Sequence, residues 1–258
     1  MAHTYKILLS NLGYARGISG KFSHHVRYLH RHFYCSPTVQ KNALRQLGTL
    51  ITREDPDLCC FVEIDKGSFT SGGYNQLHAL MDAKYPHFDI ENKYGPTSQL
   101  RSFFVTRGKS NGFMAKHDFP HERIYFRHGT KRLVYKITLA PRLFLFFSHL
   151  SLNRSVRRAQ LLEVRELMDG VSGEVVFLGD FNILSGLSEL SALLEHPGIV
   201  LLNQEDVPTF TFHKRELLLD LCFCSVGLAA SSRLTVVPQA YSDHAALVLE
   251  VTVPEEGA

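Results

Sequence analysis

The chain has 258 residues, of which 45% are hydrophobic and 21% are charged, with a net charge of +3. These values are ordinary for a folded protein with a sizeable core, and they exclude a chain too polar to fold. The longest apolar run, residues 143–147, is too short to span a membrane, and the run at residues 7–9 is too short for a signal peptide.

Positive charge is concentrated at the start of the chain. Residues 1–53 contain eight Lys or Arg and no Asp or Glu, so the rest of the chain is acidic on balance. A basic lobe beside an otherwise acidic body indicates an anionic partner.

The five cysteines are an odd number, and they do not have the spacing of a zinc site. Four of them lie in apolar runs that are typical of buried strands. We therefore expect reduced thiols and a cytoplasmic protein.

Strands and helices alternate in the first hundred residues. Residues 5–11 predict a strand, and Ser36 followed by Pro37 predicts the start of a helix whose apolar positions continue to Ile51. Residues 57–63 predict a buried strand that ends at an acid, and residues 72–83 predict a second helix.

The pattern from residue 101 onward is mainly that of strands. Further helices are expected at residues 156–168 and 187–194, and strands at residues 101–105, 112–115, 124–126, 133–139, 143–150, 175–178, 210–212, 218–223, 234–237 and 245–251. No repeat, linker or change in composition marks a boundary. We expect one domain over residues 1–258, built from two packed sheets with helices outside.

Several apolar strands end in, or contain, polar side chains. Asp180 and Asn182 stand two residues apart at a strand end and should project the same way. The full set is Asn11, Glu63, His149, Asp180, Asn182, Asp220, Asp243 and His244. One such residue alone would most often mark the start of a loop, but unpaired charges beside apolar strands are costly, so the set indicates a shared cleft.

The residue types in this set suit hydrolysis at phosphorus. Glu63, Asp243 and Asn11 offer hard oxygen ligands for Mg²⁺ or Mn²⁺. Asp220, within a strand, could hold an imidazole in one orientation. A metal, acids and oriented imidazoles provide the charge neutralisation and water placement that such hydrolysis needs.

The ordered set resembles the endonuclease/exonuclease/phosphatase superfamily and its deoxyribonuclease-like members. The most specific parts are Gly179-Asp180-Phe181-Asn182 and Ser242-Asp243-His244, which occur in the family's order near the end of the chain. The resemblance implies a four-layer α/β sandwich of two mainly antiparallel sheets, and cleavage of a phosphoester bond that depends on Mg²⁺ or Mn²⁺.

The resemblance also implies roles for individual residues. Glu63 would bind the metal, with Asn11 and Asp243 near the metal or its phosphate. Asp180 would orient or deprotonate water. The remaining roles would be phosphate binding by Asn182, base or charge-stabilising action by His244 paired with Asp220, and assistance to the leaving group by His149.

Two residues of the helix expected at 156–168 and one residue of a loop are further candidates for substrate binding. Arg157 and Gln160 lie on one helix face, where they could contact substrate or tie the helix to a strand. Asn111 resembles part of a recurrent loop near the cleft of the family. Asp65 is expected at the surface.

Residues 21–34 interleave four aromatic side chains with three Lys or Arg and four histidines. Such a segment could grip a nucleic-acid backbone and stack bases, or meet anionic lipid head groups. It could also form an amphipathic helix that packs Phe22, Tyr28 and Phe33 against the body.

We therefore predict a Mg²⁺-dependent phosphodiesterase that acts on nucleic acid. The alternatives are a phospholipid, sphingomyelin or inositol-phosphate hydrolase of the same fold, and a binding module without activity, which the intact acidic set disfavours. Peripheral membrane contact stays open, and a monomer is favoured.

Overall fold

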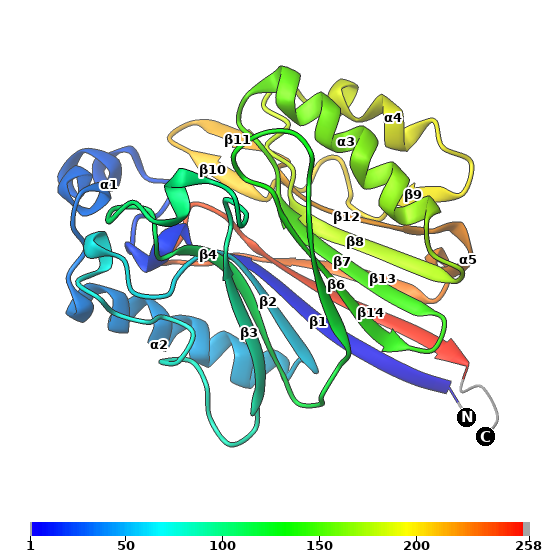
Figure 1. Cartoon of the computed structure of the whole chain (residues 1–258), viewed down its shortest axis with the longest axis horizontal. Helices are drawn as coiled ribbons and strands as arrows, with labels where there is room; N and C mark the ends of the chain where they lie inside the picture. The colour runs from blue at the N-terminus through cyan, green and yellow to red at the C-terminus, as the bar shows by residue number, and fades with distance from the viewer. Residues whose placement is uncertain (1, 255–258) are drawn as a thin grey trace.

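Two six-stranded sheets lie face to face in the computed structural model, which describes residues 2–254 (Figure 1). The first sheet has the order β13 (Ser232–Val237), β14 (Ala246–Pro254), β1 (Ala2–Asn11), β2 (Leu58–Asp65), β4 (Lys109–Ala115) and β3 (His87–Asn92). The second has the order β5 (His121–Tyr125), β6 (Leu133–Ala140), β7 (Leu143–His149), β8 (Glu174–Asp180), β12 (Asp220–Ser225) and β9 (Ile199–Leu201). A separate hairpin joins β10 (Phe210–Phe212) to β11 (Arg215–Leu217).

Each sheet contains one parallel pair among antiparallel neighbours. The parallel pairs are β1 with β2 and β7 with β8. The other pairs in both sheets are antiparallel. The prediction of two mainly antiparallel sheets is therefore confirmed.

Helices cover the outer face of each sheet. The longer ones are α2 (Pro37–Glu54) under the first sheet and α3 (Arg154–Asp169) over the second, and the short α4 (Ser191–Leu194) lies beside α3. Two further short helices, α1 (Phe22–Arg27) and α5 (Val226–Ala229), do not cover an outer face: α1 buries no residue, and α5 adds Leu228 to the core between the sheets. Short 3-10 turns are η1 (Gly13–Ala15), η2 (Leu29–His32), η3 (Phe69–Ser71), η4 (Gln99–Arg101) and η5 (Leu187–Leu190). These layers confirm the predicted four-layer sandwich.

Strand alternation divides the apolar side chains between three cores. Ile7 and Leu9 of β1 enter the core between the two sheets, whereas Leu8 faces the core that α2 covers. A third core lies between the second sheet and the helices α3 and α4. Because β7 and β8 are buried on both faces, they are almost continuously apolar until they reach the site.

Two predicted elements are wrong. Residues 72–83 form turns instead of a helix, because Gly72 and Gly73 both take positive φ angles and the buried Gln76 side chain fixes the loop by bonding Asp65 N and Tyr14 O. Residues 101–105 form turns instead of a strand, and the hydroxyl of Thr106 closes this loop on the carbonyl of Leu100.

Asp65 is buried and not at the surface as expected. Its carboxylate accepts hydrogen bonds from the Ser68 backbone and hydroxyl, and it lies 2.9 Å from Lys109 Nζ. A buried acid of this kind is retained because it has a buried cation and several donors around it.

All five cysteines are free and buried. Within residues 2–254, no helix combines the length and the apolar character needed to cross a membrane.

Candidate active site

Strand pairing in the second sheet brings three of the predicted residues side by side. His149 of β7 pairs with Asp180 of β8, and Asp180 pairs on its other side with Asp220 of β12. Asn11 ends β1 of the first sheet, and His244 precedes β14. The site therefore lies where the ends of strands from both sheets meet.

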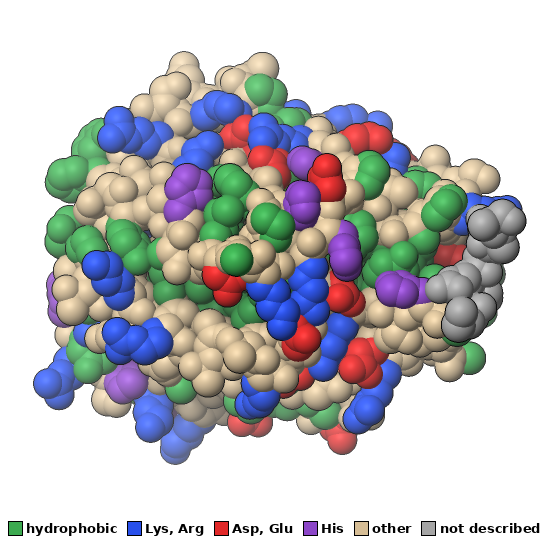
Figure 2. All heavy atoms as spheres, turned by 90° about the horizontal axis from the view of Figure 1, so that it is seen from below, with side chains coloured by type: hydrophobic (Ala, Val, Ile, Leu, Met, Phe, Trp, Pro, Cys, Tyr) green, Lys and Arg blue, Asp and Glu red, His purple; other side chains and the backbone are tan. Residues whose placement is uncertain are grey.

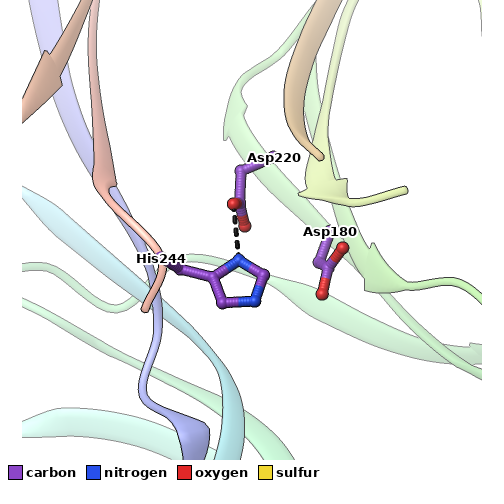
Figure 3. A group of neighbouring side chains, drawn as sticks. All are labelled: Asp180, Asp220 and His244. Carbon is purple, nitrogen blue, oxygen red and sulfur yellow. Dashed lines mark hydrogen bonds and ion pairs between the residues drawn. The ribbon is translucent and has the colours of Figure 1, made fainter. Parts of the chain in front are cut away.

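His244 connects the two sheets through Asp220. Its Nδ1 lies 2.7 Å from Asp220 Oδ2, and both side chains are buried. Figure 3 shows the imidazole turned toward Asp220, with Asp180 beside the ring. One potential ligand atom from each of the three residues lies within 4.8 Å of the others, so the group could also bind a cation.

The protonation states of His244 and Asp180 are strongly shifted. Burial alone would lower the pKa of His244, but Asp220, Asp180 and Asp243 outweigh it and raise this pKa to about 10. Burial raises the pKa of Asp180 to about 7, with Asp220 adding to the effect and His244 opposing it. At neutral pH the site thus holds a charged imidazolium beside a carboxyl group that can accept a proton.

Two asparagines orient Asp180. Asn11 Nδ2 donates to Asp180 Oδ2 at 3.0 Å, and the backbone N–H of Asn182 donates to Asp180 Oδ1 at 3.0 Å. Asn182 has a positive φ of 52° and donates its side-chain amide to Leu150 O. These bonds fix the carboxyl group from both sides.

Steric crowding explains why a glycine begins the Gly179-Asp180-Phe181-Asn182 stretch. A Cβ at Gly179 would lie 2.3 Å from the backbone oxygen of Ser148. Only glycine lets β7 and β8 approach closely enough to place His149 beside Asp180.

Glu63 is aimed into the site by an irregularity in β2. The pairing of β2 with β4 shifts register between Phe61 and Ile64, and Glu63 has a positive φ of 54°. The side chain of Asn111 accepts a weak hydrogen bond from Glu63 N at 3.4 Å. Asn111 is itself buried, and its contact favours a role in holding Glu63; substrate binding by Asn111 stays a prediction.

Glu63 is ionised despite its surroundings. Burial would raise its pKa, but the charges of Lys93, Lys131 and Arg16 hold this pKa well below the usual value. Lys93 Nζ lies 3.2 Å from Glu63 Oε1. A carboxylate that keeps its charge here is suited to binding a cation.

His149 lies between Glu63 and Asp180. Its Nε2 is 3.3 Å from Asp180 Oδ2 and contacts Lys131 Nζ, and its Nδ1 is 3.7 Å from Glu63 Oε1. Burial and Lys131 hold the pKa of His149 well below its usual value, so the ring is neutral at pH 7. Its Nδ1 is buried without a hydrogen-bond partner among residues 2–254.

One cavity of about 150 Å³ contains Glu63, Asp243 and His244 in its wall. The other residues that line it are Leu12, Gly13, Arg16, Ile18, His25, His32 and Tyr241. Burial raises the pKa of Asp243, and neighbouring Glu63 adds to this effect. Two carboxyl groups facing one cavity, each penalised by burial, are a donor set that fits Mg²⁺ or Mn²⁺. Asn11 is less suited, because its amide oxygen already accepts from Gly13 N.

Arg157 and Gln160 do not reach this cavity. Arg157 is buried and bonds Glu189 Oε2, Ser151 O and Leu152 O. Gln160 bonds Ser151 N and the carbonyl groups of the loop that carries Lys131. The sequence allowed either substrate contact or a structural role for these two residues, and their contacts favour the structural role.

Lys93, Lys131 and Arg16 were missed by the sequence analysis. Lys93 follows β3, a strand that was not predicted, and Lys131 lies in a loop with no motif of its own. Their proximity in the fold is the only sign that these cations offset the negative charges of Glu63 and Asp180.

The comparisons with known proteins concern the family and the fold. Residues 36–244 match the model of the endonuclease/exonuclease/phosphatase family. No curated protein matches the sequence.

Three solved structures illustrate how well the fold is shared. TDP2 from Caenorhabditis elegans is 16% identical, with a TM-score of 0.65 over 97% of this chain and 75% of that one. ANGEL2, a 2',3'-cyclic phosphatase, is 13% identical, with a TM-score of 0.65 over 97% and 95%. The endonuclease domain of TRAS1, a telomere-specific non-LTR retrotransposon, is 15% identical, with a TM-score of 0.60 over 98% and 100%.

Proposed function

The chain belongs to the endonuclease/exonuclease/phosphatase family, whose members are phosphoester hydrolases, and we propose that it hydrolyses a phosphodiester bond with the help of Mg²⁺ or Mn²⁺. The observation that carries this proposal is the group of His244, Asp220 and Asp180, with Glu63 and Asp243 facing the adjoining cavity. An imidazolium, a carboxyl group with a pKa of about 7 and an anionic cation site are the parts that water attack on phosphorus requires.

Each part has a distinct task in the proposed reaction. Asp180 orients the attacking water and accepts its proton, because its pKa lies near neutral pH. His244 remains protonated and stabilises the negative charge that develops on the phosphoryl oxygens. Asp220 keeps the imidazole charged and oriented.

His149 and Asn182 stand at the border of the reaction centre. The neutral His149 ring lies between the carboxyl groups of Glu63 and Asp180. Its Nδ1 has no hydrogen-bond partner among the described residues, so this atom is suited to contact the leaving-group oxygen. Asn182 is placed to contact the phosphate if its amide exchanges Leu150 O for a phosphoryl oxygen.

Glu63 and Asp243 would hold the metal ion, with Asn11 nearby on the Asp180 side. When bound, the ion supplies charge neutralisation at the phosphate. We place it here instead of between Asp180, Asp220 and His244, because His244 Nδ1 is already committed to Asp220.

Two substrate classes fit the charge of the chain. Nucleic acid and an anionic membrane both present phosphates to a basic surface. Nucleic acid is supported by the basic residues 1–53 and by an endonuclease domain among the similar folds. A membrane phosphoester is supported by the exposed apolar side chains of residues 22–33, a segment that also lines the site.

The reaction class can be tested with Asp180→Asn. The variant should reduce hydrolysis of bis(p-nitrophenyl) phosphate by about 10²- to 10⁴-fold, because it removes the proton acceptor. Asp118→Asn, at a side chain that is 85% exposed, is the matched control and should keep full activity. A panel of DNA, RNA, sphingomyelin, phosphoinositides and small phosphodiesters then ranks the substrates. Unchanged turnover by Asp180→Asn would contradict the assignment.

We also propose that the chain is a monomeric, single-domain protein of a reducing, cytoplasmic compartment. The free buried cysteines and the core shared by both sheets support these proposals. Sedimentation and unfolding experiments test the monomer and the single domain.

A further inference from the structure

The segment from Phe22 to Tyr34 exposes the apolar face of its helical turns. Neither α1 nor η2 contains a buried residue. Phe22 and Val26 lie on α1, Leu29 begins η2 and Phe33 follows η2, and these side chains are 54%, 63%, 58% and 74% exposed. Of the two alternatives left open by the sequence, the one in which Phe22 and Phe33 are packed against the body is therefore disfavoured, although the Phe22 ring contacts His213. We call these four residues the apolar stripe.

Other exposed aromatic side chains continue the apolar stripe across neighbouring loops. Tyr34 lies 6.5 Å from Phe69, Phe69 lies 5.7 Å from Phe104, and Phe104 lies 4.8 Å from Phe103, measured between ring centres. Each of these four rings is about half exposed. A connected group of this kind is unusual on a surface that only meets water, and it marks an interaction site.

Positive charge surrounds the apolar stripe. Lys21 and Arg27 are exposed within the segment, and Arg107 is exposed beside Phe103 and Phe104. No acidic residue occurs anywhere in residues 1–53. In Figure 2, hydrophobic side chains reach the surface among Lys and Arg at the left end, which is the end where α1 lies in Figure 1.

The same segment forms one wall of the catalytic cavity. His25 and His32 line this cavity together with Glu63 and Asp243. The His25 ring packs against Phe212 of β10, and His213 N donates to Gly20 O at 2.7 Å. A partner that binds the apolar stripe would therefore lie directly beside the reaction centre.

The side chains of the stripe fit a lipid bilayer better than a nucleic acid. Bases stack on aromatic rings, but Val26 and Leu29 offer no ring for stacking. Exposed apolar side chains with Lys and Arg beside them are typical of segments that lie at the surface of anionic membranes, and α1 and η2 present such side chains. Phe and Leu enter the acyl region, and basic side chains contact the phosphates.

We propose that the apolar stripe, together with Phe69, Phe103 and Phe104, docks onto an anionic phospholipid bilayer and presents the catalytic cavity to a phosphoester at the membrane surface. The second part rests on the proposed hydrolase function, whereas the docking itself does not.

Vesicle sedimentation with the full chain tests the docking. Wild-type protein should sediment with vesicles of phosphatidylcholine and phosphatidylglycerol in equal parts, and at least about tenfold less with phosphatidylcholine alone. Val26→Ser/Leu29→Ser/Phe33→Ser should lose about tenfold or more of this binding. The matched control, Leu162→Ser/Leu194→Ser/Val226→Ser, changes three exposed apolar residues away from the stripe and should bind as wild type does.

A charge variant and a soluble substrate separate the outcomes. Arg27→Gln/Arg107→Gln should weaken binding to the anionic vesicles by about tenfold, because each basic residue near the surface contributes to it. Hydrolysis of bis(p-nitrophenyl) phosphate should be equal in the stripe variant and wild type. If wild-type protein binds vesicles but hydrolyses no phosphodiester, the docking stands and the proposed function fails.

Two results would overturn the docking. One is vesicle binding that the stripe variant retains in full. The other is the absence of vesicle binding by wild-type protein, including the case in which it binds single-stranded DNA or RNA through the same stripe.

Discussion

His244 Nδ1 lies 2.7 Å from Asp220 Oδ2, and this buried pair joins the first sheet to the second at the site. Burial lowers the pKa of His244, and Asp220 is the residue that contributes most to raising it. The state of the imidazole should therefore depend on a residue that need not touch the substrate.

Asp220→Asn should lower the pKa of His244 by about 1 to 3. Wild-type His244, with a pKa of about 10, stays charged through neutral pH, whereas the variant should lose this charge as the pH rises. Its activity should therefore fall on the alkaline side, where wild-type activity persists. Rate profiles against pH and NMR titration of the metal-free protein check this, and superimposable profiles would contradict it.

Asp180→Asn should stabilise the metal-free protein while it removes activity. The folded-state pKa of Asp180, about 7, lies above its value in the unfolded chain, so ionisation costs stability as the pH rises from about 4 toward 7 and above. Replacing the acid by an amide removes this cost, which is of the order of 4 kcal/mol at pH 8, because the shift is about three pKa units of ~1.4 kcal/mol each. Thermal unfolding at pH 8 with a chelator should give a higher Tm for the variant. A lower Tm would mean that the Asn11 and Asn182 hydrogen bonds outweigh the burial of the charge.

Asp65→Asn should destabilise the fold by about 3 to 5 kcal/mol, because it leaves Lys109 buried without its partner. Asp65→Asn/Lys109→Met should recover part of this loss. Lys109 and Ser68 lower the pKa of Asp65 against burial, so its contribution is present above the unfolded value near about 4 and is lost as the pH falls below it. Urea unfolding at pH 7 and at acidic pH measures both effects, with Asp118→Asn as control. A loss below 1 kcal/mol at pH 7 would contradict the prediction.

The chain should unfold in a single cooperative transition. Residues from both sheets, including Ile7 and Leu178, share one core, so neither sheet keeps its packing when the other is lost. Calorimetry of the metal-free protein should give equal calorimetric and van't Hoff enthalpies. Two resolved transitions would show that the chain is not one domain.

Much of the fold was predictable because the apolar patterns are long and regular. The strands through Asn11, His149 and Asp180, and the helices α2 and α3, follow from alternation, helical spacing and the cap at Ser36. The family model agrees with the resemblance that the two motifs carry.

Other features depend on contacts between distant parts of the chain. The turns after Gly72 are fixed by Gln76, which bonds a backbone group near the N-terminus. Asp65 looks like a surface residue until Lys109 is placed beside it. The bulge that aims Glu63 and the cations that surround it also leave no local pattern in the sequence.

The most direct test of the central claim is a metal titration of the hydrolysis rate, with wild-type protein and Glu63→Gln stripped by EDTA. The account predicts no turnover of bis(p-nitrophenyl) phosphate by stripped wild-type protein, a saturable recovery with Mg²⁺ or Mn²⁺, and a recovery in Glu63→Gln that needs much more metal. Full activity of stripped wild-type protein, or an identical metal requirement in both proteins, would contradict it.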